Sequence, residues 1–384
     1  MRFPEFSGEW ETKSINDLAD VIGGGTPDTT VKSYWDGGIQ WFTPSEIGKN
    51  KFVDASLRTI TEDGLNNSSA KLLPPNTLLL SSRATIGECS LSLRECATNQ
   101  GFQSLVSKNC NVDFLYYLIQ TKKKDLIRKS CGSTFLEISA NEVRKIQVSV
   151  PSDVEQQKIA ELLSLIDKRI ATQNKIIEDL KLLKSAIIEE HYKQSEKQCV
   201  LIADLGEPFS VGNLSKDDLT DTGTPCVIYG ELFTTYREII SHVESYTNKS
   251  DGMTFSKKGD LLFPSSTTVD AVSLITPSAI NIDNVVLGGD MFGIHINSDY
   301  NAQYLSYYFN HIAKKQFAKY AKGSTIIHLH YKDIEKNKLL LPCLIEQNKT
   351  ANNLISLDEK IKIESSYLQS VIKQKTYLLR QMFI

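Results

Sequence analysis

The sequence has no apolar run approaching the roughly 20 residues that span a bilayer. Its first residues, MRFPEFSGEW, contain neither a secretory signal nor a lipidation motif. The seven cysteines are odd in number and scattered, and no Cys-x-x-Cys pair indicates zinc or redox chemistry. We therefore expect a cytoplasmic protein whose thiols stay reduced.

Recognisable catalytic machinery is also lacking. No Gly-rich phosphate loop occurs, so ATP-driven translocation is not encoded in this chain. Leu73-Pro74-Pro75-Asn76 has only a superficial likeness to a methyltransferase Pro-Pro motif, since its Asn follows the prolines, and a turn is the better interpretation. His328 and His330 share one face of a strand, but no cysteine or carboxylate set completes a metal site beside them. We predict no catalytic residue, metal or cofactor in this chain.

The net charge is only −3, so the overall charge does not favour nucleic acid. Any DNA contact must come from lysines and arginines that cluster locally.

An internal repeat dominates the sequence. Residues 132–192 align without a gap on residues 323–383, at an offset of 191, and 13 of the 61 paired positions are identical. The identical positions include the Gly-Ser-Thr that begins at Gly132 and at Gly323. A repeat of this length predicts that the chain is built from two similar halves.

Each repeat consists of a short strand, a proline and a long helix. The strands are predicted at residues 146–150 and 338–341, and Pro151 and Pro342 mark the helix starts. The first helix is predicted from Asp153 to about Tyr192, far longer than an ordinary globular helix. Its apolar residues alternate steps of four and three, as in a coiled coil. These residues are Ile159, Leu163, Ile166, Ile170, Ile177, Leu180 and Ile187, and in the second helix Leu354, Leu357, Ile361, Leu368, Val371 and Leu378.

The order of domain, helix, domain, helix requires the two helices to pack antiparallel. The predicted fold class is therefore α+β, with two mixed, mostly β domains separated by two long antiparallel helices in a pseudo-two-fold repeat. We expect a rod with one domain at each end. The predicted parts are residues 1–150, 151–195, 196–341 and 342–384, in the order domain, spacer helix, domain, spacer helix.

The two domains share further features. Asp17-Leu18-Ala19-Asp20 aligns with Leu201-Ile202-Ala203-Asp204 near the start of each domain. Short apolar strands ending in hydroxyl residues begin at Asn76 and Gly259, and aromatic helices begin at Asn111 and Asn301. A basic stretch follows each aromatic helix, and its recurrence favours contact with DNA phosphates. The basic residues proposed for this role are Lys123, Lys124, Arg128, Lys314, Lys315 and Lys319.

These motifs carry a family resemblance that covers the whole chain. Gly24-Gly25-Thr26-Pro27, Ser81-Ser82-Arg83-Ala84-Thr85-Ile86-Gly87 and Asn99-Gln100-Gly101 resemble a target-recognition domain of a type I restriction-modification specificity subunit. The Pro-x-x-x-Glu-Gln phrase from Pro151 is similar to the start of that family's spacer helix. The second domain departs from the pattern, with Val211-Gly212-Asn213 in place of the glycine turn. Such a departure is expected if the two domains read different sequences.

The resemblance implies a non-catalytic subunit that reads a bipartite, asymmetric DNA site, with a gap set by the paired helices. Polar side chains would read base edges, while phosphate contacts would hold the register. Arg83 is the residue we expect to bind a guanine. The full set proposed for base contact is Thr26, Ser82, Arg83, Thr85 and Gln100 in the first domain, and Ser266, Thr267, Thr268 and Asn284 in the second.

The resemblance also implies partners. They are double-stranded DNA, two copies of an S-adenosylmethionine-dependent methyltransferase subunit, and restriction or translocase subunits that use ATP and Mg²⁺. A pseudo-two-fold subunit would offer two nearly equal docking surfaces, which gives a reason for the two copies.

Two alternatives stay open from the residues alone. A coiled-coil scaffold could link two protein-binding domains without touching DNA, although matched basic helices would then lack an explanation. A stand-alone methyltransferase with a recognition domain is disfavoured because the cofactor motifs are missing.

Overall fold

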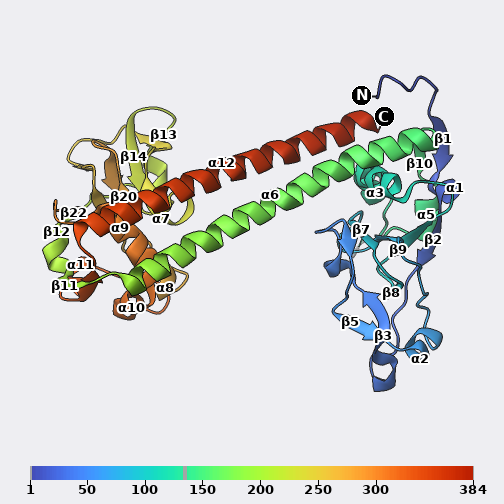
Figure 1. Cartoon of the computed structure of the whole chain (residues 1–384), viewed down its shortest axis with the longest axis horizontal. Coiled ribbons are helices and arrows are strands. Elements are labelled where there is room, and N and C mark those ends of the chain that lie inside the picture. The colour runs from blue at the N-terminus through green and yellow to red at the C-terminus, as the bar shows by residue number, and fades with distance from the viewer. Residues whose placement is uncertain (1, 133–135, 384) are drawn as a thin grey trace. The chain divides into compact units, whose positions relative to one another are not determined.

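A computed structural model describes residues 2–132 and 136–383 (Figure 1). The chain divides into two compact units, one formed by residues 1–174 and 366–384 and the other by residues 175–365. Each unit therefore contains parts of both long helices, whereas the division predicted from the sequence treats each helix as a separate part. Ser133 and Thr134 of the first Gly-Ser-Thr lie outside the described residues.

The first unit contains a five-stranded sheet in the order β2-β9-β6-β7-β4, a three-stranded sheet in the order β5-β3-β8, and the pair β1-β10. Most neighbours in these sheets are antiparallel, but β3 pairs with β8 and β4 with β7 in parallel. The strands are β1 Glu11–Ser14, β2 Ala19–Gly23, β3 Trp35–Phe42, β4 Phe52–Val53, β5 Arg58–Ile60, β6 Leu78–Leu80, β7 Cys89–Ser92, β8 Cys96–Thr98, β9 Gln103–Ser107 and β10 Gln147–Val150.

Short helices accompany these sheets, together with 3-10 turns at Lys32–Tyr34 and Pro44–Glu46. The aromatic helix α3 places Phe114, Leu115 and Leu118 in a core that also contains Met382 and residues of the long helix α6, Asp153–Gln194. This shared core holds the sheets against the long helices. The short helices are α1 Ile15–Leu18, α2 Glu62–Asn66, α3 Val112–Thr121, α4 Lys123–Arg128 and α5 Ala140–Arg144.

The second unit contains five-stranded sheets in the orders β12-β22-β18-β20-β15 and β13-β16-β14-β21-β17, with the pairs β11-β24 and β19-β23. The strands are β11 Gln198–Leu201, β12 Gly206–Ser210, β13 Leu219–Thr220, β14 Thr224–Ile228, β15 Ile239–Ile240, β16 Ser245–Thr247, β17 Thr254–Phe255, β18 Asp260–Pro264, β19 Ser266–Thr267, β20 Ser278–Ile280, β21 Val286–Gly288, β22 Met291–Ile296, β23 Ile327–His328 and β24 Lys338–Leu341. Both units are mixed and mostly β outside the long helices, as predicted.

The stretch of chain from the cap of the aromatic helix to the first basic residue is one residue longer in the second unit than in the first. Asn111 and Asn301 cap the two helices, and the basic residues Lys123 and Lys314 follow them by 12 and 13 positions. A π-helical turn at Tyr308–Ala313 accommodates the extra residue. The helices here are α7 Glu231–Thr234, α8 Ala271–Leu274, α9 Ala302–Tyr307, α10 Lys314–Phe317 and α11 Tyr331–Ile334, with 3-10 turns at Ile202–Leu205, Lys216–Asp218 and Ala318–Tyr320.

The two long helices are α6, Asp153–Gln194, and α12, Leu344–Met382. Each begins just after its proline and follows a strand, β10 or β24, so the predicted strand, proline and helix are confirmed. Every apolar position of the predicted coiled-coil stripe is buried or half-buried. The polar residues Gln173 and Lys184 are buried on the same stripe.

Within each unit the helices run antiparallel (Figure 1). In the first unit Asp167 of α6 pairs with Lys375 of α12 at 2.7 Å, while the earlier residue Ile159 shares a core with the later residue Met382. In the second unit Lys184 pairs with Asp358, and the later residue His191 contacts the earlier residue Thr350. The predicted antiparallel packing is therefore confirmed in both units.

The predicted alignment at the start of the domains was wrong by three residues. Strand β1 pairs with β10 as β11 pairs with β24, with Glu11 opposite Val150 and Gln198 opposite Leu341. The amide of Ile15 donates to the carbonyl of Ile146, and that of Ile202 to the carbonyl of Asn337. Ile15, not Leu18, therefore corresponds to Ile202.

Candidate nucleic-acid interface

Three loops of the first unit meet at the sites that the sequence singled out. The amide of Gly25 donates to the carbonyl of Thr98 at 2.8 Å, and the amide of Ser82 donates to the carbonyl of Gly101 at 2.8 Å. The Thr26 hydroxyl donates to the side-chain carbonyl of Gln100. The glycine turn, the Ser-Arg loop and the Asn-Gln-Gly loop therefore form one continuous surface.

Arg83 is the cation of this surface. Its Nε lies 2.8 Å from the Glu137 carboxylate, and 42% of its side chain is exposed. Ala84 follows in the left-handed region, at φ 55°, and the exposed Thr85 donates a hydrogen bond from its hydroxyl to Ser81. The guanidinium is thus held by an acid at one edge while part of it stays accessible to a ligand.

Two of the predicted hydroxyl contacts are buried. Ser82 is fully buried and Ser266 is almost so, and each precedes a more exposed residue, Arg83 or Thr267. Both buried residues would need a rearrangement to reach a base. They are placed to support the loops rather than to contact a ligand directly.

The basic residues of the first unit differ in whether they pair with an acidic side chain. Lys123 pairs with Glu88, and Arg128 pairs with Asp125 at 2.7 Å within α4. Lys124 is exposed. Two of these three cations therefore already have an acidic neighbour.

In the second unit the predicted residues lie on separate segments. Thr267 ends β19, and the exposed Thr268 follows it. Asn284 lies in the turn between β20 and β21, at φ 63°, and its amide donates to the carbonyl of Ser256. The two threonines adjoin each other, whereas Asn284 belongs to another loop.

The basic stretch of the second unit is also only partly accessible. Lys315 and Lys319 are exposed. Lys314 is half-buried, and this burial lowers the pKa of its ammonium in spite of the opposing charges of Asp270 and Glu238. The exposed lysines that correspond best between the units are therefore Lys124 and Lys315.

Sequence reasoning missed a matched polar cluster that joins each domain to the long helices. In the first unit the Tyr117 hydroxyl donates to Asp167 at 2.6 Å, and Lys375 pairs with the same carboxylate. In the second unit the Tyr307 hydroxyl donates to Asp358 at 2.6 Å, and Lys184 pairs with it at 2.8 Å. We call these the Tyr-Asp-Lys clusters. The identity of the Asp and Lys in both repeats was the signal that could have revealed them.

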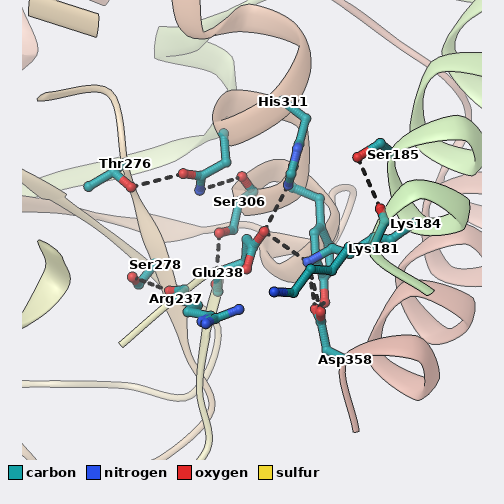
Figure 2. A network of polar contacts seen from close by, with 12 residues as sticks. Lys181, Lys184, Ser185, Arg237, Glu238, Thr276, Ser278, Ser306, His311 and Asp358 are labelled. Carbon is teal, nitrogen blue, oxygen red and sulfur yellow. Dashed lines mark hydrogen bonds and ion pairs between the residues drawn. The ribbon is translucent and has the colours of Figure 1, made fainter. Parts of the chain in front are cut away.

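The second cluster extends to Glu238 and His311 (Figure 2). Glu238, just before β15, lies 3.0 Å from Lys184 and 2.8 Å from His311. Burial alone would raise the pKa of Glu238, but the hydrogen bond with His311 and the charge of Lys184 outweigh it and lower the pKa to about 2. Glu238 is therefore a buried carboxylate that stays ionised.

The residue corresponding to Glu238 in the first unit is a lysine. Phe52 and Ile239 occupy matching places in the parallel pairs β4-β7 and β15-β20, so Lys51 corresponds to Glu238. Lys51 pairs with Asp113 at 2.7 Å and donates to the Ser164 hydroxyl at 2.6 Å. At this matching position the first unit therefore has a cation and the second unit an anion.

Across residues 2–132 and 136–383, no three His, Cys, Asp or Glu side chains gather as a metal site would require. No helix within these ranges has the length and apolarity to cross a membrane.

Comparisons with known proteins agree with this architecture. The MjaIX specificity subunit of Methanocaldococcus jannaschii, from a type I restriction enzyme, is 38% identical over 199 residues, which cover 49% of this chain and 46% of that protein. The EcoR124I/EcoR124II specificity subunit of Escherichia coli is 31% identical over 214 residues, covering 54% and 51%. The chain thus spans about half the length of these two relatives. The MjaVIII specificity subunit of M. jannaschii is 23% identical but matches 99% of this chain and 92% of its own length.

Solved structures share the fold. The S subunit of a type I restriction-modification system from M. genitalium superposes with a TM-score of 0.63 at 15% identity, over 100% of this chain and 99% of that one. A chain of another type I system gives a TM-score of 0.61 at 12% identity, over 98% of both chains. The model of the type I restriction modification DNA specificity domain matches this chain twice, over residues 7–182 and 195–374. The chain therefore belongs to the family of type I restriction modification DNA specificity domains and carries two copies of that domain.

Proposed function

We propose that this chain is the DNA-recognition subunit of a type I restriction-modification complex and that each domain reads one half of a bipartite site. The observation that carries the proposal is the duplication itself: each half matches the DNA specificity domain, and each contains a Tyr-Asp-Lys cluster. The chain is non-catalytic in this proposal and contains no cofactor. A DNA ligand also implies the cytoplasmic location expected from the sequence.

The paired helices would set the gap between the half-sites. Helix α6 has 42 residues and α12 has 39, and a helix of this length extends roughly 60 Å at about 1.5 Å per residue. A coiled coil resists bending better than a loop does. The spacing between the two recognised half-sites would therefore be fixed.

The base contacts that we propose come from the accessible residues of the predicted set. They are Thr26, Arg83, Thr85 and Gln100 in the first domain and Thr267, Thr268 and Asn284 in the second. The buried Ser82 and Ser266 would support these loops.

Arg83→Ala should relax the specificity of the first half-site. Arginine binding to a guanine edge contributes about 1–3 kcal/mol of discrimination, so preference at one base pair should fall by roughly 10- to 100-fold. Sequencing of duplexes selected from a randomised library measures this preference. Arg94→Ala is the matched control, since Arg94 is an exposed arginine paired with Asp54 at 2.7 Å. An unchanged recognised sequence in the Arg83 variant would remove this residue from the interface.

The double variant Lys124→Gln, Lys315→Gln should bind every duplex more weakly while keeping its recognised sequence. Each lost phosphate contact reduces the slope of log K against log salt by about 0.9, so the double variant should lose roughly 1.8. Titrations at several salt concentrations measure the slope. The exposed Lys181 of α6, changed to Gln, provides the control. An unaltered slope would show that neither lysine contacts phosphate.

The partners that we propose are two methyltransferase subunits that bind S-adenosylmethionine, and restriction or translocase subunits that use ATP and Mg²⁺. Exposed apolar residues recur at matching positions of the two helices, Val154 with Ile345 and Ile176 with Tyr367. Such pairs would offer two similar docking surfaces. Light scattering of the complex should give two methyltransferase subunits per chain, and a one-to-one mass would contradict this count.

Footprinting of the complex on DNA tests the function directly. We expect two protected half-sites separated by an unprotected gap, and a bipartite modified sequence in the methylome of the host. One continuous site would favour a stand-alone enzyme, and no protection would favour the protein-only scaffold.

A further inference from the structure

The two units share a small three-segment sheet at the place where the first carries Arg83. In the first unit the backbone of Arg83 forms an antiparallel β-bridge with that of Glu137, and Glu137 forms another with Cys131. In the second unit Ser266 pairs with His328, and His328 bridges to Lys322. Both sheets therefore consist of one segment after a core strand and two segments that lie before and after the Gly-Ser-Thr in the sequence.

Backbone hydrogen bonds fix the correspondence between these sheets. The amide of Ile138 donates to the carbonyl of Ser82 at 3.1 Å, and that of Leu329 donates to the carbonyl of Ser265 at 2.9 Å. Cys131 and Glu137 exchange two hydrogen bonds, and Lys322 and His328 do the same. Arg83 thus corresponds to Ser266, Glu137 to His328 and Cys131 to Lys322.

The turn that closes the second sheet requires glycine. Gly323 adopts φ +122°, and a Cβ at this position would lie 2.0 Å from the carbonyl oxygen of Ile326. The hairpin therefore holds Lys322 and His328 opposite each other with little freedom.

The charges are distributed differently over the two sheets. The first has its cation on the first segment and an acid on the middle one. The second has a neutral, buried serine on the first segment, an imidazole on the middle one and the 77% exposed side chain of Lys322 on the third. The cation therefore lies on the third segment of the second sheet instead of the first segment. An imidazole takes the place of the acid on the middle segment.

Each of these two cations forms an ion pair with an acidic side chain. Lys322 pairs with Asp333, whose side chain is only 14% exposed and accepts a hydrogen bond from the amide of His330 at 3.0 Å. The relation of Lys322 to Asp333 thus parallels that of Arg83 to Glu137. His330 is exposed, and its ring lies nearly parallel to that of His328, 6.1 Å away between centroids.

We propose that Lys322 and His328 form the hydrogen-bond donor set of the second half-site, at the place where the first domain presents Arg83; this inference rests on the proposed function. The ligand atoms are acceptors on duplex DNA, either the N7 and O6 edge of a guanine or phosphate oxygens. Thr267 lies on the neighbouring strand, where it pairs with Ile327. The second domain thus reads DNA with a lysine and an imidazole in place of an arginine.

The test uses the intact complex, purified from its host through a tag on this chain, and a library of duplexes with randomised positions. The variants are Lys322→Gln, His328→Gln and the double variant. Lys322→Arg keeps the charge and should retain binding. Lys332→Gln is the control, since Lys332 is an exposed lysine of the neighbouring helix α11.

With base contact, the double variant should lose discrimination at one or two base pairs of a single half-site, by on the order of 10- to 100-fold, while the other half-site stays unchanged. With phosphate contact, the recognised sequence should stay the same while affinity for all duplexes falls and the salt slope decreases by about 0.9. Either result supports the proposal. A double variant with wild-type sequence preference, affinity and salt slope would overturn the proposal while leaving the proposed function intact. If the wild-type complex selects no bipartite sequence, the proposed function fails and this inference fails with it.

Discussion

Lys184→Met should lower the free energy of unfolding by about 3–5 kcal/mol, because its removal leaves the carboxylates of Glu238 and Asp358 without the ammonium that they share. Only 9% of the Lys184 side chain is exposed, and its ammonium lies within 3.0 Å of Glu238 and 2.8 Å of Asp358. Methionine has a similar length, so the loss should come from the charge rather than from a cavity. Urea denaturation of the purified chain, followed by circular dichroism, measures the change.

The neighbouring Lys181 gives a matched control, as it lies on the same helix but is exposed (Figure 2). Lys181→Met should change the stability by less than about 0.5 kcal/mol, as surface substitutions usually do. If the Lys184 and Lys181 variants had equal stability, the cluster around Lys184 would not stabilise the second unit.

Acid should remove the contribution of Glu238 to the stability of the same cluster. Its pKa is lowered from 4.5 to about 2 in the folded chain. Such a group stabilises the fold at pH values above its unfolded pKa, and the contribution is lost as the pH falls from about 4.5 to 2. A shift of this size corresponds to roughly 3 kcal/mol, at about 1.36 kcal/mol per pKa unit.

The comparison with Glu238→Gln isolates this contribution from that of the other carboxylates. The variant should be less stable than the wild type at pH 7, and the difference should shrink as the pH falls to 2. Denaturation curves at pH 7, 4 and 2.5 test this convergence. A difference that is constant with pH would mean that Glu238 is not held ionised by Lys184 and His311.

Sequence reasoning predicted the helices and the repeat well because their signals are local or periodic. The prolines at 151 and 342 end the strands, and the apolar spacing marks the buried stripe over about 40 residues. The start of each domain was harder to align. Its register is set by pairing of β1 with β10 and of β11 with β24, more than 100 residues away, and no local pattern encodes that pairing.

The interface was predicted only in part. The glycine, Ser-Arg and Asn-Gln-Gly motifs do meet, and Thr26 contacts Gln100. Which of two adjacent polar residues faces outward could not be read from the sequence, because the core strand ends in a run of hydroxyl residues without alternating apolar ones. Ser82 turned out to be buried while Arg83 is accessible. The Tyr-Asp-Lys clusters depend on contacts between distant segments, so their pairing was not foreseen.

The opposite charges at Lys51 and Glu238 have a consequence for any exchange of one domain for the other. If the first domain were grafted into the second position, Lys51 would meet Ile355 where it now finds the Ser164 hydroxyl, and Lys184 would lose one of its two carboxylates. The two domains are therefore not interchangeable at this position without loss of these contacts. A functional chimera would need compensating substitutions in the helices as well as a transplanted domain.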